Sequence, residues 1–164
     1  MTASAAHVRD LLREVLDPEI PALTILDMGI VRDVRITGSQ VEVDITPTYS
    51  GCPAMREIES GIVDVLARHG FMQARVNTVF REAWTTDWMS PEGKEKLRAY
   101  GIAPPGQAPR HETPFPLNSL KLSISCPFCG SRRTELRSEF GSTACKSLHY
   151  CLGCEQPFEG FKAL

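Results

Sequence analysis

The stretch Thr46-Pro47-Thr48-Tyr49-Ser50-Gly51-Cys52-Pro53 lies between a strand pattern and a helix pattern. Before it, Val41, Val43 and Ile45 alternate with polar residues, which predicts a half-buried strand. After it, apolar residues recur at helical spacing, namely Met55, Ile58, Ile62, Val65 and Leu66. They predict an amphipathic helix that ends before Gly70. With Pro53 at the first helical position, Cys52 is expected at or next to the helix cap.

A cysteine at a helix start has two interpretations. Free amide groups and the positive end of the helix dipole favour a thiolate, so the pKa of Cys52 is expected to fall below the usual value of about 8.5. Cys52 is then a candidate nucleophile or metal ligand. The alternative is a small residue that fills a tight turn.

The segment before the strands contains a helix and an acidic loop. Apolar spacing predicts a helix over about residues 4–16, with one buried face made of Val8, Leu11, Leu12, Val15 and Leu16. Asp17-Pro18 ends it, and Asp17, Glu19 and Asp27 follow in loops that can face the Cys52 turn. Together with Thr46 and Thr48 they are candidate cofactor-binding residues. The alternative for Asp17 and Asp27 is that they cap backbone N–H groups.

The pattern around these loops predicts an α+β domain. Two strands flank a turn at Thr37-Gly38-Ser39-Gln40, and a third strand is expected from Ala74 to Phe80. The order α-β-β-α-β gives a small two-layer domain with helices on one face of the sheet. We expect the third strand beside the first and parallel to the second.

Composition divides the rest of the chain. Trp84 and Trp88 are expected to pack in the core, with a partner surface as the alternative, and Ser90-Pro91-Glu92 begins a helix to Tyr100. The segment from Pro104 to Leu117 holds five prolines, which is typical of a linker. The predicted organisation is a domain over 1–103, a linker over 104–119 and a module over 120–164.

The C-terminal module contains two CxxC pairs, Cys126/Cys129 and Cys151/Cys154, separated by 21 residues. Each pair places two thiolates on one tight turn, and two such turns complete the tetrahedral four-sulfur shell of structural zinc. A β-hairpin fits between them. Iron in a rubredoxin-like site or a cluster is the rival metal. Because the module is small, its folding is expected to depend on the metal.

Cys145 and His149 remain outside the two pairs. Cys145 is expected to be buried filler, although a ligand or a functional thiol near the metal stays open as a cofactor-binding alternative. His149 is expected to be an exposed strand residue.

Charge and hydropathy exclude several function classes. The 164 residues carry a net charge of −2, and the module from 120 onward is near neutral once four thiolates hold Zn²⁺. Residues 1–103 have 11 basic and 15 acidic side chains. We therefore expect no nucleic-acid binding. We also expect no membrane segment and a cytoplasmic location, where six cysteines favour metal or thiol chemistry over disulfides.

Several motifs together resemble a known family. Asp17-Pro18-Glu19-Ile20-Pro21, Asp27-Met28-Gly29 and the Cys52 stretch are similar to the domain of cytosolic iron–sulfur assembly factors. The remaining motifs resemble the PaaD (PaaJ) family, encoded with bacterial phenylacetyl-CoA epoxidase; they are Trp84–Ser90, Tyr100–Pro105 and Phe140–Lys146 before a CxxC and Pro157-Phe158.

The resemblance implies a role in aerobic phenylacetate breakdown. It implies a non-catalytic maturation factor that delivers iron or an iron–sulfur cluster to the oxygenase, with Cys52 as the labile ligand. The implied partners are the di-iron oxygenase subunits and a reductase carrying a 2Fe–2S cluster and flavin. One cysteine cannot complete a cluster, so a homodimer, a partner, Cys145 or a small thiol would supply further ligands. A stoichiometric structural subunit is the alternative, and a thiol enzyme is disfavoured because the sequence places no histidine base.

Overall fold

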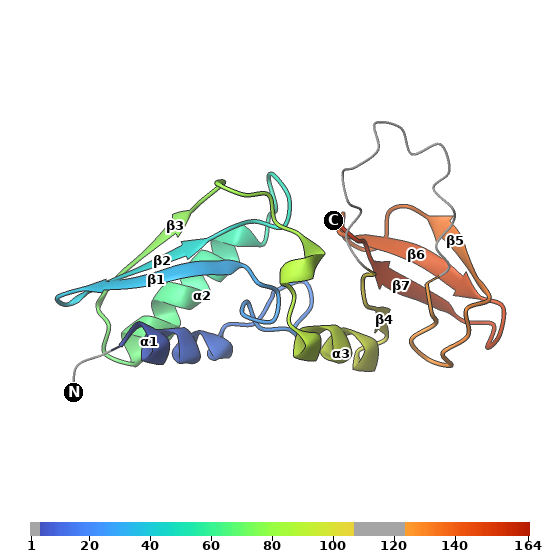
Figure 1. The fold of residues 1–164 in the computed structure, drawn as a ribbon, viewed down its shortest axis with the longest axis horizontal. Coiled ribbons are helices and arrows are strands. Elements are labelled where there is room, and N and C mark those ends of the chain that lie inside the picture. The colour runs from blue at the N-terminus through green and yellow to red at the C-terminus, as the bar shows by residue number, and fades with distance from the viewer. Residues whose placement is uncertain (1–3, 107–123) are drawn as a thin grey trace. The chain divides into compact units, whose positions relative to one another are not determined.

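The computed structural model describes residues 4–106 and 124–164, which form two compact units (Figure 1). The first unit comprises residues up to 84 and 88–93, and the second comprises 85–87 and 94–164. Each unit is described by itself below.

The first unit contains a three-stranded sheet in the order β1-β2-β3. Its strands are β1 (Val31–Thr37), β2 (Gln40–Ile45) and β3 (Gln73–Thr78). The β1–β2 hairpin is antiparallel and turns at Gly38 with a φ of 62°, as expected. β3 is parallel to β2, which is also as predicted, but it lies beside β2 rather than beside β1. The prediction of its neighbour was wrong because the handedness rule fixes the hand of a crossover but not which edge it reaches.

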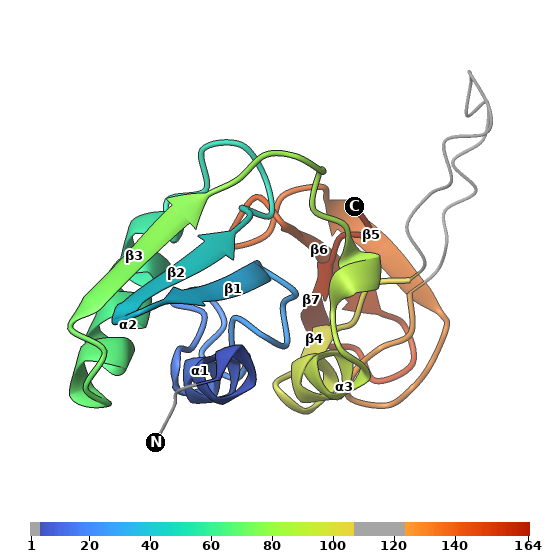
Figure 2. The ribbon, with the colours of Figure 1, turned by 60° about the vertical axis from the view of Figure 1, so that its left-hand side comes forward.

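Helices cover one face of this sheet (Figure 2). They are α1 (Ala5–Leu11), the 3₁₀ helix η1 (Leu12–Glu14) and α2 (Met55–Arg68). The predicted face of the first helix is buried at Val8, Leu12 and Val15, but Leu16 is 50% exposed. The helix ends at Glu14, and Val15 is extended, so Leu16 no longer follows the helical period. The stripe of α2 is buried as expected.

Trp84 belongs to the core of the first unit. Its side chain is buried, and its indole N–H donates a hydrogen bond to the Met28 carbonyl at 2.8 Å. Trp88 is half-buried, with the Arg32 guanidinium 3.6 Å from its ring centroid. Gly29 has a φ of 68°, and an added Cβ would lie 2.5 Å from the Trp88 carbonyl oxygen. The Asp27-Met28-Gly29 motif therefore serves close packing.

The second unit contains a four-stranded sheet in the order β4-β7-β6-β5. Its strands are β4 (Ile102–Ala103), β5 (Thr134–Ser138), β6 (Lys146–Cys151) and β7 (Pro157–Phe161). β5, β6 and β7 are antiparallel neighbours, whereas β4 runs parallel to β7. The expected hairpin between the CxxC pairs is thus β5–β6. The fold class is confirmed as a mixed α+β domain with a C-terminal four-cysteine module of the zinc-ribbon type.

Two short helical elements lie near the change from one unit to the other. They are η2 (Thr86–Trp88) and α3 (Pro91–Ala99), which begins where expected because the Ser90 hydroxyl accepts a hydrogen bond from the Gly93 N–H at 2.9 Å. Residues 94–103, which the sequence assigned to the first domain, cluster with the second unit. The predicted linker falls mostly on 107–119, outside the described residues, so the domain boundaries remain predictions.

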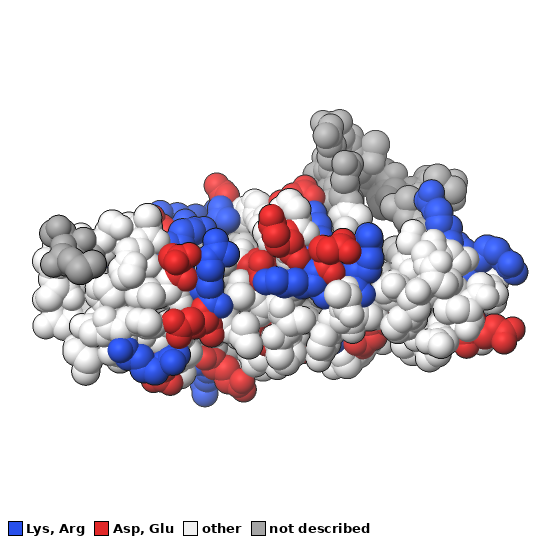
Figure 3. All heavy atoms as spheres, turned by 90° about the horizontal axis from the view of Figure 1, so that it is seen from below, with Lys and Arg blue, Asp and Glu red and all other residues white. Residues whose placement is uncertain are grey.

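The described residues include no helix long and apolar enough to cross a membrane. Acidic and basic side chains alternate over the face in Figure 3, without a broad patch of one sign. This mixture agrees with the balanced composition of the sequence.

Candidate functional site

The Cys52 turn leaves the end of β2 and is anchored by Thr46. This side chain is 2% exposed, and its hydroxyl donates a hydrogen bond to the Val79 carbonyl. The Thr46 N–H donates to the Ile30 carbonyl at 3.0 Å. Thr46 therefore connects the start of the turn to the segments at Ile30 and Val79. Its hydroxyl proton is used in the hydrogen bond to Val79.

Cys52 is half-buried and lies just before α2 rather than at its cap. The helix begins at Met55, with Ala54 at the cap position, and Pro53 lies in the preceding turn. The prediction that Pro53 occupies the first helical position was wrong. Cys52 instead joins two consecutive turns, because its N–H donates to the Tyr49 carbonyl at 3.3 Å and its carbonyl accepts from the Met55 N–H at 3.4 Å.

The environment of the thiol opposes ionisation. Burial raises the pKa of Cys52 above its usual value, and the negative charge of Glu19 raises it further. Hydrogen bonds from the Ala54 N–H and from the side chains of Thr48 and Tyr49 lower the pKa without cancelling this effect. The expectation of a lowered pKa was wrong, because desolvation outweighs the helix start. Near neutral pH the free side chain is a thiol.

The candidate acidic residues separate into two groups. Asp17 is buried, and its Oδ1 accepts hydrogen bonds from the N–H groups of Glu19 at 2.9 Å and Ile20 at 2.7 Å. Asp27 is buried too, and its carboxylate accepts from the Thr24 N–H, from the Thr24 hydroxyl and from the Ser90 hydroxyl. Both residues make the capping contacts that were the alternative interpretation.

Glu19, the third acidic candidate, differs from Asp17 and Asp27 because it affects the pKa of the Cys52 thiol. Thr48 also affects this pKa. Glu19 is half-buried and contributes a charge, whereas Thr48 contributes a hydroxyl hydrogen bond. The structure thus brings Glu19, Thr48 and Cys52 together. Whether any of these residues binds a cofactor remains a prediction.

The four cysteines of the CxxC pairs converge in the second unit. All four sulfur atoms of Cys126, Cys129, Cys151 and Cys154 lie within 4.8 Å of one another. The Sγ–Sγ distance is 3.7 Å for Cys126–Cys154 and 3.5 Å for Cys129–Cys151, so neither pair is a disulfide. A tetrahedron with Zn–S bonds of about 2.3 Å has sulfur–sulfur edges of about 3.8 Å. The cluster therefore has the dimensions of a metal site.

The electrostatics of the cluster also favour a bound cation. The Cys154 and Gly153 N–H groups lower the pKa of Cys151 to about 6. Burial and the neighbouring sulfurs raise the pKa of Cys154 to about 12. One sulfur is thus readily ionised while another resists ionisation beside it. A bound divalent metal removes this conflict because it stabilises all four thiolates at once.

Cys145 and His149 are not members of this four-sulfur group. Cys145 is buried with its Sγ 3.1 Å from the Thr143 hydroxyl, and it is not among the four converging cysteines. His149 is buried, which corrects the expectation of an exposed residue. Its Nε2 lies 2.8 Å from the Ser147 hydroxyl and its ring stacks on Phe158. The alternation of side chains along a strand could have predicted this burial, since His149 lies two residues before the buried Cys151 and therefore on the same face.

Comparison with known proteins agrees with both halves of this description. Residues 5–74 match the family model described as an iron–sulfur cluster assembly protein, and residues 111–162 match the PaaD zinc beta ribbon domain. A curated relative from Escherichia coli strain K12 is 45% identical over 154 residues, which cover 94% of this chain and 90% of the relative. That relative is named as a subunit of a "Putative 1,2-phenylacetyl-CoA epoxidase".

Two solved structures resemble part of the chain. A domain of unknown function, DUF59, from Bacillus anthracis has a TM-score of 0.53 and 28% identity, covering 57% of this chain and 90% of that one. The conserved hypothetical protein TM0487 from Thermotoga maritima has a TM-score of 0.50 and 29% identity, covering 59% of this chain and 98% of that one. Both agree with a small α+β domain.

Proposed function

This chain belongs to the PaaD family, and we propose that it matures the phenylacetyl-CoA epoxidase system by delivering iron or an iron–sulfur cluster. The observation that carries the proposal is the position of Cys52. This half-buried cysteine lies within residues 5–74, the part of the chain similar to iron–sulfur assembly proteins. In this role the protein does not catalyse epoxidation.

The protonated state of Cys52 suits a labile ligand. Binding of a soft metal would displace the thiol proton, and reprotonation would favour release, because the raised pKa of Cys52 lets a proton compete with the metal. Glu19 adds negative charge that offsets part of the positive charge of bound iron, and Thr48 donates a hydrogen bond to the sulfur. Asp17, Asp27 and Thr46 hold the loops in place through their backbone contacts.

The ribbon is proposed to hold zinc permanently and to dock the client. Four sulfurs within 4.8 Å leave no open coordination position for a tetrahedral metal, which suits a structural role. The proposed partners are the di-iron oxygenase subunits and the iron–sulfur/flavin reductase, in the cytoplasm. Further ligands for a cluster at Cys52 would come from such a partner, a small thiol or a second protomer. Cys145 is a weaker candidate because it is buried.

The test is Cys52→Ser in cells that co-express the epoxidase components. Sulfur and oxygen differ little in size, so the turn should persist, but a hydroxyl is a poor ligand for iron. We expect a folded protein with normal zinc, loss of phenylacetyl-CoA-dependent activity and a reductase with weak cluster absorbance. Ser50→Ala changes an exposed residue of the same turn and should behave as wild type. Normal activity and iron content in Cys52→Ser would overturn the proposal.

A stoichiometric structural subunit is the second candidate, favoured because the relative is named as a subunit. The two candidates differ in when the protein is needed. A maturation factor can be removed from the loaded oxygenase without loss of activity, whereas a structural subunit must remain in the active complex. Activity of the purified, metal-loaded components with and without this chain separates the two.

A further inference from the structure

The outer edge of β3 has no partner strand among the described residues (Figures 1 and 2). Its pairing with β2 is regular over Gln73–Thr78, and this segment contains no proline. The other edge strand, β1, carries an irregularity between Val31 and Asp33. Bulges and prolines are common devices that keep an edge from pairing with another chain. β1 has such a device, and β3 does not.

Backbone geometry determines which residues of β3 offer hydrogen bonds outward. The Val79 N–H donates to the Ile45 carbonyl at 2.8 Å, and Ile45 is the register partner of Thr78. Successive residues of a strand direct their backbone groups to opposite sides. Odd-numbered residues of β3 therefore bond to β2. Ala74, Val76 and Thr78 direct their N–H and C=O groups to the free edge.

Two large apolar side chains flank this edge. Met72 is 79% exposed and Phe80 is 71% exposed, the two highest values among large apolar side chains of the described residues. Met72 precedes β3 and Phe80 follows it. Both have even numbers, like Ala74, Val76 and Thr78, so an extension of the strand would direct their backbone groups to the free edge too. A regular, unprotected edge with exposed apolar ends is a surface suited to strand pairing.

We propose that β3 pairs antiparallel with β3 of a second copy of this chain, with Val76 on the two-fold axis. In this register Ala74 lies opposite the partner's Thr78, and Met72 lies opposite the partner's Phe80. All these residues are even-numbered, so the outward backbone groups of the two strands meet as hydrogen-bonded pairs. The interface joins the two three-stranded sheets into one and covers the apolar ends.

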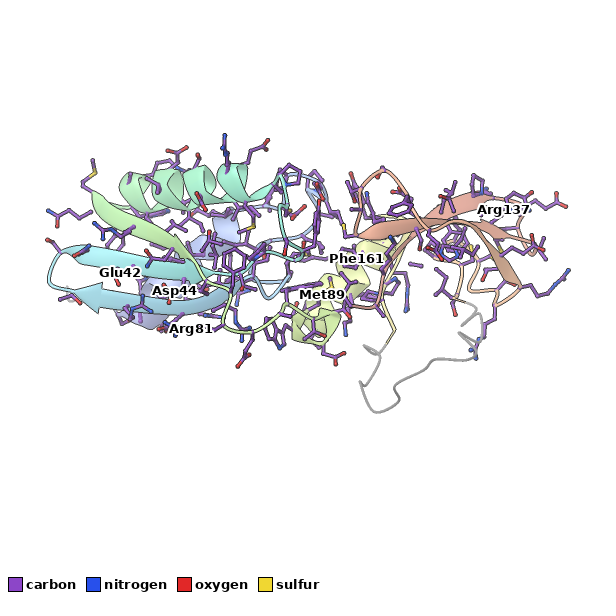
Figure 4. All side chains as sticks on the ribbon, turned by 90° about the horizontal axis from the view of Figure 1, so that it is seen from above. Glu42, Asp44, Arg81, Met89, Arg137 and Phe161 are labelled. Atoms are coloured by element: carbon purple, nitrogen blue, oxygen red, sulfur yellow. The ribbon has the colours of Figure 1, made fainter. Side chains whose placement is uncertain are left out.

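Charge disfavours the neighbouring register that has Arg75 on the two-fold axis. With Arg75 on the axis, two guanidinium groups would lie directly opposite each other, which is destabilising. With Val76 on the axis, Arg75 lies opposite the partner's Asn77. The Asn77 amide donates to Asp44 at 3.1 Å, and the hydrogen bond from Arg35 lowers the pKa of Asp44 to about 2, so Asp44 is ionised. Figure 4 labels Asp44 on β2. Arg75 thus lies opposite a neutral amide that is held by Asp44, and not opposite a second guanidinium.

The pairing also constrains the arrangement of the two Cys52 turns. Each turn follows the C-terminal end of β2, which is parallel to β3. Antiparallel β3 strands point their C-terminal ends in opposite directions, so the two Cys52 turns lie toward opposite ends of the joined sheet. A dimer of this kind does not share one cluster between two Cys52 residues. The interface itself does not depend on the proposed iron delivery.

The test compares two double variants of the full chain by sedimentation equilibrium. In Met72→Lys/Phe80→Lys, each lysine faces a lysine across the axis. In Met72→Lys/Phe80→Glu, each lysine faces a glutamate. Both variants change the same exposed positions, so their effects on the fold of one protomer should be alike, which circular dichroism checks. We expect wild type to dimerise and the Lys/Lys variant to dissociate at least about tenfold more easily than the Lys/Glu variant.

Each outcome bears on the proposal. Recovery of the dimer in Lys/Glu that weakens in high salt supports the register, because cross-strand ion pairs are screened. A wild-type protein that remains monomeric overturns the proposal and leaves the edge to a strand of another protein. Equal dimerisation of all three proteins overturns it too, because the interface then lies elsewhere. Loss of iron delivery in Cys52→Ser with an unchanged dimer would leave this inference intact.

Discussion

The four-cysteine cluster and the Cys52 turn differ in how complete they are. The cluster brings four sulfurs within 4.8 Å of one another from two short turns of one unit. The Cys52 turn offers one thiol, with Glu19 and Thr48 beside it, and a raised pKa. A complete coordination shell of four protein ligands retains its metal. A single protein ligand can bind a metal only together with ligands from other molecules. The difference separates a site suited to stability from a site suited to exchange.

The largest expected effect comes from breaking the cluster. Cys126→Ser or Cys151→Ser should remove about one metal ion per chain and unfold the ribbon. One apolar cluster of this unit consists of Ala103, Cys126, Cys151 and Phe158, with Ile124 and Cys154 against it. Three of the four ligands are thus part of that cluster, and a small module gains much of its stability from its metal. Metal analysis and limited proteolysis measure both effects.

The matched control for the cluster is Cys145→Ser, a buried cysteine of the same unit outside the cluster. It should keep the metal. The first unit should stay protease-resistant in all three variants, because its core is made of other residues. Full metal content and an intact C-terminal fragment in Cys126→Ser would contradict the assignment. Zinc rather than iron in the wild-type protein would identify the resident metal.

A smaller effect is expected from Asp27→Ala, which tests whether Asp27 belongs to the Cys52 site or to the fold. The substitution removes a buried carboxylate and leaves the Thr24 N–H and the Ser90 hydroxyl without their acceptor. Loss of such contacts costs about 1 to 3 kcal/mol, so the urea midpoint should fall clearly. Asp10→Ala removes an exposed carboxylate that pairs with the exposed Arg13 and should change the midpoint little.

Maturation measured at a temperature where Asp27→Ala is fully folded then decides the role of Asp27. Normal epoxidase maturation would assign Asp27 to the fold alone. Lost maturation with an unchanged midpoint would return it to the site and weaken the contrast between the two regions.

Sequence patterns predicted what depends on local spacing. The CxxC pairs predicted the cluster, and the alternation at Val41, Val43 and Ile45 predicted β2. Long-range packing decided the rest. The position of β3 depends on which sheet edge α2 reaches. The burial of Asp44 is a second example, because Asp44 is one of the polar residues that alternate with Val41, Val43 and Ile45. Asp44 is buried because Arg35 and Asn77 reach it from the neighbouring strands, a contact that requires the register to be known.

The Cys52 turn shows the same limit at a functional residue. The motif correctly predicted a turn between β2 and α2, but a pKa depends on what surrounds the sulfur in space. Burial and Glu19, which is 33 positions away in the sequence, reversed the expected direction. The helix-start argument considered only the local backbone.

The smallest expected effect is that of Glu19→Gln on the reactivity of Cys52. Removal of the negative charge should lower the pKa of Cys52 only slightly, because half-exposed charges are partly screened. The thiolate fraction between pH 7 and 8 then rises, and iodoacetamide should alkylate Cys52 faster. Mass spectrometry of the Cys52 peptide reads this residue separately from the metal-bound cysteines.

Salt and a second variant separate charge from structure in this experiment. The difference between Glu19→Gln and wild type should shrink in about 1 M salt, where the Debye length is about 3 Å. Glu14→Gln, which removes a carboxylate paired with Arg68 and His69, should leave the rate unchanged. Equal rates for Glu19→Gln and wild type at low salt would mean that burial, without Glu19, raises the pKa of Cys52. Glu19 would then have no electrostatic part in the exchange of a metal at this turn, and the hydrogen bonds from Ala54, Thr48 and Tyr49 would be the remaining polar contacts of the thiol.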